Sequence, residues 1–242
     1  MSESLEARIA RAKAYPFARH DHCFLYEDGA ARPLAPGPCD VAGRVPVLAA
    51  GSNQSHEQLR RKYAAIPGTV IPVWRGRLAD FDVVYAAHLT GYGSVPATFQ
   101  HSPGTDVTVF VTWLTGPQLE RMHETEGNYT YDRLSRIRLA LDRGGDLTEA
   151  YVYSSKVGCL AHRGGCVAIA EIAAAGRRFP ALGQTEMLGA VRDRFDPGAA
   201  LDAFIAAQLT DEALRRDRSR RLGEGSLPLL YARETMRDGL GR

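Results

Sequence analysis

VPVLAAGSNQSHEQL, at residues 45–59, is the stretch from which the fold is inferred. Its first six residues are apolar and suit a buried β-strand, and the part from Ser55 onward suits a helix in which Ser55 and Gln58 form a capping box. Between the two, Gly51 lets the backbone approach a ligand closely, and N–H groups ahead of a helix can bind an anion or oxyanion. An ordinary turn capped by Ser55 has the same features, so a second motif is needed to indicate a function.

Further strands follow this stretch and indicate a single sheet. Runs of β-branched and aromatic residues, each bounded by Gly, Pro or Asp, stand at residues 69–74, 81–89, 95–99 and 106–114. Residues 136–142 alternate and residues 149–155 follow after a Gly-Gly turn, which predicts a hairpin. A second helix, 116–127, is opened by a proline and closed by a glycine. We expect residues 45–155 to form a mixed sheet curled into a barrel, with both helices packed outside it.

Glu126 is the candidate acid/base residue because it stands at the last turn of the predicted helix 116–127. The negative end of the helix dipole favours a protonated carboxyl group, which predicts a raised pKa in the range useful for proton transfer. Many helices also end in glutamates without a catalytic role. The position of Glu126 alone leaves both interpretations open.

Together, the loop and Glu126 give the sequence a resemblance to the γ-glutamylcyclotransferase family. That family combines a strand ending in a Tyr-Gly-Ser-Asn loop with a later Leu-Asp-x-x-Glu-Gly segment and a tyrosine. The matching residues here are Ala50-Gly51-Ser52-Asn53 and Met122-His123-Glu124-Thr125-Glu126-Gly127, with Tyr129 and Tyr131 downstream and the strand and turn Val95-Pro96-Ala97-Thr98-Phe99 and Ser102-Pro103-Gly104 between them. The resemblance covers residues 45–155. It implies an α+β fold, a mixed β-barrel with flanking helices, to which this chain adds a C-terminal helical extension.

The resemblance also implies a reaction. The α-amine of a γ-glutamyl compound attacks its own γ-carbonyl, which releases an amine and closes 5-oxoproline. Glu126 is then the general acid/base, no metal or cofactor is required, and the residues in contact with substrate are Ala50, Gly51, Ser52, Asn53 and Tyr131. Backbone amides of the loop hold the substrate carboxylate or the developing charge.

Two alternatives to this reaction stay open. Ala50 stands where the family has a tyrosine, which removes a ring and a hydroxyl from the pocket wall and favours a protein that binds a metabolite without catalysis. The other alternative is a transfer reaction at a different amide or ester carbonyl, which uses the same Glu126 carboxylate.

Two extensions flank the predicted barrel. Residues 1–44 begin with an amphipathic helical pattern and continue into a proline-rich stretch that predicts a loop or an extended covering segment. Residues 156–242 contain an Arg163-Gly164-Gly165 turn that predicts a hairpin, and from Gln184 onward they predict two or three helices. We expect these helices to pack on the barrel through apolar residues at spacings of three and four: Met187, Leu188, Val191, Phe195, Leu201 and Phe204.

Composition argues against several classes of partner. The chain of 242 residues is 45% hydrophobic and 24% charged with a formal net charge of +2, so its charge gives no reason to expect a nucleic-acid or membrane partner. The first residues lack the apolar run of a secretory signal or membrane span. We therefore expect a cytoplasmic protein that acts on a small-molecule substrate. The sequence does not predict its oligomeric state.

The cysteines are few and scattered. Cys23, Cys39, Cys159 and Cys166 do not suggest a disulfide framework in a chain of this length, so we expect reduced thiols. Together with His20, His22 and His162 they lack the paired spacing of a structural zinc module. No metal site is predicted.

Overall fold

The computed structural model describes residues 3–34 and 39–239, so part of the predicted proline-rich stretch and the first two residues lie outside the described chain. Its helices are α1 (Leu5–Lys13), the short 3₁₀ helix η1 (Ser52–Gln54), α2 (His56–Tyr63), α3 (Gly116–His123), α4 (Gln184–Phe195), α5 (Leu201–Thr210) and α6 (Glu212–Glu224). Within the described ranges, none of them is both long and apolar enough to cross a membrane.

The strands are β1 (Phe24–Glu27), β2 (Ala30–Pro33), β3 (Val45–Ala49), β4 (Val70–Tyr85), β5 (Ala97–Leu114), β6 (Tyr129–Leu141), β7 (Asp146–Ser155), β8 (Ala161–His162), β9 (Gly165–Cys166), β10 (Ala168–Ile169), β11 (Ala174–Ala175), β12 (Ala181–Leu182) and β13 (Glu234–Asp238). Strands β5, β3, β7, β6 and β4 are hydrogen-bonded in that order, and β4 pairs again with β5, so the sheet closes into a barrel. β3 and β7 are parallel, whereas the other neighbours in the barrel are antiparallel. With helices packed against it, this mixed barrel has the predicted α+β fold class.

β4 and β5 each join two of the predicted apolar runs, because each strand continues through the polar residues between those runs. The pair bends at a β-bulge between Ala79 and Phe81, where Asp80 adopts a φ of 62°. The Asp80 carboxylate accepts a hydrogen bond from the N–H of Gly104 at 2.8 Å. This contact ties the two strands together at the bend.

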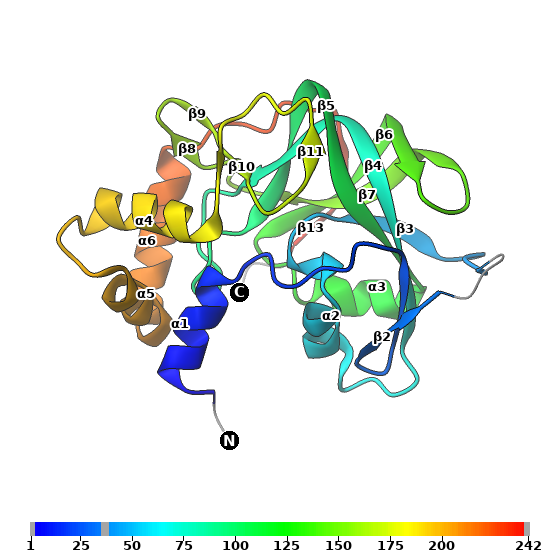
Figure 1. The fold of residues 1–242 in the computed structure, drawn as a ribbon, viewed down its shortest axis with the longest axis horizontal. Helices are drawn as coiled ribbons and strands as arrows, with labels where there is room; N and C mark the ends of the chain where they lie inside the picture. Colours follow the sequence, from blue (N-terminus) through cyan, green and yellow to red (C-terminus); the bar gives the residue numbers. More distant parts are fainter. Residues whose placement is uncertain (1–2, 35–38, 240–242) are drawn as a thin grey trace.

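The residues of β3 alternate between two hydrophobic clusters. Leu48 joins the larger cluster with Val111 of β5 and Val152 of β7, whereas Val47 and Ala49 join the smaller one. The smaller cluster also contains buried side chains of α2 and α3. These two helices lie next to each other below the barrel in Figure 1. Both faces of the barrel strands are therefore covered, which explains why their sequences read as nearly continuous apolar runs.

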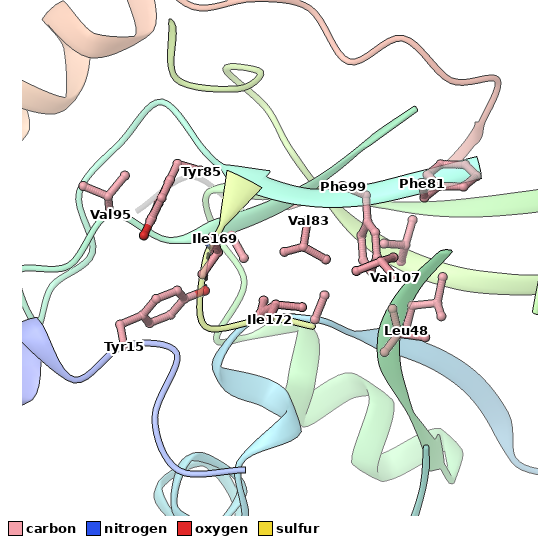
Figure 2. Close-up of a cluster of buried hydrophobic side chains, with 14 of the residues drawn as sticks. Tyr15, Leu48, Phe81, Val83, Tyr85, Val95, Phe99, Val107, Ile169 and Ile172 are labelled. Carbon is pink, nitrogen blue, oxygen red and sulfur yellow. Dashed lines mark hydrogen bonds between the residues drawn. The ribbon is translucent and has the colours of Figure 1, made fainter. Parts of the chain in front are cut away.

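The segment ahead of β3 is joined to the barrel by strands and by aromatic side chains. β1 pairs with β2 on one side and with β4 on the other. Phe24 and Tyr26 are fully buried in the smaller cluster, while Tyr15 enters the larger cluster, where Figure 2 shows it facing Ile169. α1 contacts α4 and α5, so the N-terminal and C-terminal helices gather on one side of the barrel (Figure 1).

The C-terminal extension contains the predicted hairpin, β8 and β9, and the predicted helices. The six apolar residues named above all belong to the larger cluster, with Met187, Leu188, Val191 and Phe204 buried and Phe195 and Leu201 at its edge. The prediction of helices alone after Gln184 is wrong for the last residues, because β13 pairs antiparallel with β6. Its side chains are mostly exposed, so it has no alternating apolar pattern to signal a strand.

The helix caps differ from the predicted ones. The Ser55 hydroxyl is buried without a hydrogen-bond partner among the described residues, and the Gln58 side chain accepts from Arg11 at 3.1 Å. The predicted capping box at α2 is therefore wrong. A capping box is present at α3 instead, where the backbone N–H of Thr115 donates to Gln118 Oε1 at 3.0 Å.

Candidate functional site

A cavity of about 800 Å³ lies where the loop after β3, the turn after α3, the segment after β4 and the side of α6 come together. The residues predicted from the loop motif, Ala50, Gly51, Ser52 and Asn53, line this cavity together with Glu126. Since β3 and α3 lie far apart in the sequence, it is the barrel that brings the two motifs to one place.

Glu126 lies beyond the helix that was expected to carry it. α3 ends at His123, and the N–H of Glu126 donates to the His123 carbonyl at 3.2 Å in the turn that follows. The prediction of a last-turn position is therefore wrong. The Glu126 carboxylate forms an ion pair with the ammonium group of Lys62 on α2.

Lys62 and Glu126 form a buried ion pair in the cavity wall. Lys62 Nζ contacts Glu126 Oε1 and lies 3.1 Å from Met122 Sδ, and the two charged side chains are only 5% and 11% exposed. Asn53 Nδ2 donates to the same Oε1 at 2.9 Å, so the loop and Glu126 are in direct contact. Within the described residues, the hydrogen bonds of this carboxylate go to Oε1, which leaves Oε2 as an acceptor for a ligand.

Asn53 offers a second acceptor next to this carboxylate. A carboxylate oxygen accepts hydrogen bonds, so the contact with Glu126 fixes the amide nitrogen of Asn53 toward it. The amide oxygen, Oδ1, is buried and has no partner among the described residues. Two acceptors in one wall suit an ammonium or N–H group of a ligand.

Tyr15 explains the glycine at position 51. A Cβ added to Gly51 would clash with the Tyr15 hydroxyl, so only glycine allows this close approach. The Tyr15 hydroxyl accepts from the N–H of Ala97 at 2.8 Å, and the Tyr129 hydroxyl donates to the Ala97 carbonyl at 3.1 Å. Burial raises the pKa of both phenols well above 10, so both stay protonated in the cavity wall.

His88 lies in the cavity wall just after β4. It is 5% exposed, and neither ring nitrogen has a hydrogen-bond partner among the described residues. Its ring meets that of Tyr129 edge to face, with centroids 5.4 Å apart. Burial lowers the pKa of His88 to about 4, so the imidazole is neutral at physiological pH.

Cations outnumber carboxylates around the cavity. The cations in its lining are Arg61, Lys62, Arg121, Arg215 and Arg216, and the carboxylates are Glu124, Glu126 and Glu212. A cleft lined by an excess of one charge raises the local concentration of ligands of the opposite charge. The cavity therefore favours an anionic ligand, although the whole chain is nearly neutral.

Tyr131 lies outside this cavity, whereas Tyr129 lines it. The Tyr131 ring stacks on Tyr151 with centroids 5.1 Å apart and packs against His123 at 4.7 Å. Tyr131 instead lines a second, very small cavity of about 10 Å³, which Glu126 and Tyr129 also line.

Three residues of the site were not found from the sequence. Lys62 follows Leu59 by three positions on the buried face of α2, and a lysine at such a position is a signal that could have been used. His88 is the next-to-last residue of the apolar run 81–89, where a lone histidine also breaks the pattern. Tyr15 has no such signal, because nothing in its neighbourhood shows that the N-terminal segment reaches the loop.

The described residues contain no group of three or more His, Cys, Asp or Glu side chains arranged to hold a metal ion. All four cysteines are free thiols. Cys159 and Cys166 lie close to one another, with Gln100 Nε2 at 3.5 and 3.6 Å from their sulfur atoms.

Comparisons with known proteins concern the fold. No family model matches the sequence, and no curated protein does either. Among solved structures, the chain is similar to a gamma-glutamyl cyclotransferase, with a TM-score of 0.37 and 14% identity over 79% of this chain and 93% of that one. It is also similar to a crystal structure of an uncharacterized protein from Homo sapiens, with a TM-score of 0.39 and 14% identity over 80% of this chain and 94% of that one. The chain's own strand order gives the mixed barrel that the sequence resemblance implied.

Proposed function

We propose that this protein is an enzyme of the cyclotransferase type that acts on a γ-glutamyl or related amide small molecule and releases an amine and 5-oxoproline. The hydrogen bond of 2.9 Å between Asn53 and Glu126 carries this proposal. It joins the loop motif and the acidic motif at one wall of a cavity large enough for a small peptide. The proposed substrate is a small molecule in the cytoplasm, and the proposed reaction needs no metal, cofactor, nucleic acid or membrane.

The acceptors and cations of the cavity match the groups of such a substrate. Glu126 Oε2 and Asn53 Oδ1 are free to accept hydrogen bonds from the α-ammonium group. The cations of the cavity lining and the backbone amides of Gly51 to Asn53 suit the α-carboxylate of the substrate. Binding at both groups holds the α-amine and the γ-carbonyl in one cavity, which favours attack within the molecule.

The reaction then needs one group that takes a proton and returns it. Glu126 accepts a proton from the α-ammonium, and the neutral amine attacks the γ-carbonyl carbon to form the new C–N bond. Glu126 next donates this proton to the nitrogen of the leaving amine, and the old C–N bond breaks. The ring nitrogen must lose a second proton to become the lactam N–H; the Glu126 carboxylate takes it up and passes it to the released amine, which leaves as its ammonium form. Lys62 stays paired with Oε1 throughout, so it positions the carboxylate while Oε2 exchanges the proton.

A second candidate is a metabolite-binding protein on the same barrel, and the ion pair favours it. A carboxylate that already accepts from Lys62 and Asn53 has a structural role without any proton transfer. Binding of a γ-glutamyl compound without release of 5-oxoproline by the wild-type protein would support this candidate over the enzyme.

The test is release of 5-oxoproline from a panel of γ-glutamyl dipeptides and γ-glutamyl amines. Glu126→Gln keeps the shape and removes the titratable group, so turnover should fall by about 10²-fold or more. Because Glu126→Gln also leaves Lys62 without its charged partner, Lys62→Met and the double variant serve as controls. Lys62→Met keeps the carboxylate and should retain more activity than either variant that lacks it. Wild-type turnover in Glu126→Gln would contradict the mechanism.

A further inference from the structure

Unpartnered polar atoms in the cavity wall belong to Asn53 and His88. Asn53 presents Oδ1, and His88 presents both ring nitrogens, with no partner among the described residues. Burying a polar group without a hydrogen bond costs free energy, so such groups in a cavity wall point to a ligand that completes them. The mechanism above uses Asn53 and leaves His88 without a role.

The backbone and the neighbouring ring hold the imidazole of His88 in place. The backbone N–H of His88 donates to the Ala86 carbonyl at 2.9 Å, and the backbone N–H of the next residue, Leu89, donates to Ser219 Oγ of α6 at 3.1 Å. The ring of Tyr129 packs against the imidazole from the side. These contacts fix the position of the ring in the cavity wall, and both buried ring nitrogens are left without a partner among the described residues.

The neutral imidazole decides which ligand group it suits. It offers one N–H donor and one acceptor nitrogen, and it carries no charge that would attract the carboxylate of a substrate. The neighbouring Tyr129 hydroxyl already donates to the Ala97 carbonyl. In this part of the wall, His88 therefore provides a donor for a neutral acceptor such as an amide carbonyl. A neutral, preorganised donor of this kind stabilises an oxyanion more strongly than the ground-state carbonyl.

We propose that a ring nitrogen of His88 donates a hydrogen bond to the carbonyl oxygen of the amide that reacts, and that it stabilises the oxyanion formed there. This inference rests on the proposed function and deepens it. Under this inference, His88 binds the reacting carbonyl of the substrate, whereas the loop amides and the cations of the cavity bind the substrate carboxylate.

Kinetics of His88 variants test the role in the reaction. His88→Leu removes the donor, so kcat for the best γ-glutamyl substrate should fall by about 10²-fold with a much smaller change in KM. His88→Gln keeps an N–H donor and should recover part of this loss. His101→Leu is the matched control, because His101 is exposed on β5 and lies outside the cavity lining. Unchanged kcat in His88→Leu, in an enzyme that releases 5-oxoproline, would overturn the inference while the proposed function stands.

A second measurement reports on contact without turnover. In protein labelled with ¹⁵N-histidine, ring signals are followed on addition of L-5-oxoproline and of L-glutamine, which both carry the relevant carbonyl. The His88 N–H signal should shift with at least one probe, while the His101 signals stay unchanged. If the His88 signal shifts but the protein releases no 5-oxoproline from any substrate of the panel, the contact between His88 and a carbonyl stands and the proposed function is wrong. If neither probe moves the His88 signals, the inference is wrong, and this result does not depend on whether His88→Leu folds.

Discussion

Lys62 and Glu126 place two opposite charges in a wall that excludes most of the solvent. Their attraction offsets the cost of removing both from water, but a buried ion pair is seldom more stabilising than an apolar pair of similar size. Stability alone is therefore a weak explanation for the presence of a buried Lys62–Glu126 ion pair. Its position beside Asn53 and the cavity gives a stronger one, because the pair holds a carboxylate at a fixed place with one oxygen free.

Lys62→Met should lower the free energy of unfolding by about 3 kcal/mol, because it leaves the Glu126 carboxylate buried without its partner. The matched control is Arg61→Met at the neighbouring position, where the arginine is 44% exposed and pairs with Glu57 at 3.4 Å. That change should cost less than about 1 kcal/mol. Urea unfolding of both variants compares the two costs, and equal values would show that the Lys62 pair is not desolvated.

His88 should make stability depend on pH in a definite window. Its pKa is about 4 in the folded protein and 6.5 as its ordinary value, because burial disfavours the charged ring. Below about 6.5 the unfolded chain binds a proton that the folded protein does not, so stability falls as pH drops toward 4, by roughly 3 kcal/mol in total. His88→Leu should remove this loss between pH 7.5 and pH 5, as measured by urea unfolding at both pH values. An unchanged slope in the variant would mean that His88 is solvated.

At the scale of elements, β13 is attached to the barrel through one buried carboxylate. Asp132 of β6 is fully buried and accepts from Thr235 at 2.8 Å, pairs with Arg233 at 3.1 Å and accepts from Thr130 at 2.9 Å. The strand itself is polar and mostly exposed, so its own apolar contacts contribute little. Pairing with β6 and the Asp132 contacts hold it, together with the exposed ion pairs of Glu234 with Arg133 at 2.6 Å and of Arg237 with Glu120 at 2.7 Å.

Asp132→Asn should therefore loosen β13 more than it changes the rest of the fold. The amide leaves Arg233 without its charged partner and places an N–H donor against one of the two hydroxyls that donate to the carboxylate, at a cost of about 2–3 kcal/mol. Asp142→Asn removes the carboxylate from an exposed pair with Arg75 at 2.9 Å and should cost less than about 1 kcal/mol. Hydrogen exchange measures the protection of the backbone amides of residues 234–238 in both variants. Equal protection in Asp132→Asn and Asp142→Asn would contradict this account of β13.

Elements with their own apolar pattern were predictable from the sequence, whereas elements held by a partner were not. The β3 run, the hairpin at the Gly-Gly turn and the helix beginning at Gln184 all carry their signal locally. β13 depends on Asp132, which lies about a hundred residues earlier. The site divides in the same way: the loop and Glu126 are local motifs, whereas Lys62, His88 and Tyr15 join it only through tertiary contacts.

At the scale of the whole molecule, both extensions help to build the cavity that the barrel begins. Tyr15, ahead of the barrel, packs against Gly51, and α6, after the barrel, contributes Arg215, Arg216 and Ser219 to the lining. α1 and the helices α4, α5 and α6 lie on the same side of the barrel (Figure 1). The extensions therefore determine the chemistry of the mouth, and with it the class of molecule that enters.

The final prediction concerns the charge that α6 adds to this mouth. Arg216 lines the cavity, is 67% exposed and pairs with Glu212 at 2.7 Å, whereas Arg220, one turn further along α6, pairs with Asp217 at 2.7 Å outside the lining. An exposed charge contributes roughly 0.5–1 kcal/mol, so Arg216→Gln should raise KM about two- to fivefold for a γ-glutamyl dipeptide, whose leaving group carries a carboxylate.

For a γ-glutamyl amine with an uncharged leaving group, the same Arg216→Gln variant should show a much smaller change in KM, and kcat should stay the same for both substrates. Arg220→Gln is the control, because it removes an equivalent charge from the same helix without altering the cavity. The contrast between the two arginines should shrink as salt is added, since screening weakens exposed charges over about 10 Å at 0.1 M ionic strength. If Arg216→Gln and Arg220→Gln gave the same KM for the dipeptide at low salt, Arg216 would have no part in substrate binding, and the positive charge of the cavity would rest on its other cations, Arg61, Lys62, Arg121 and Arg215.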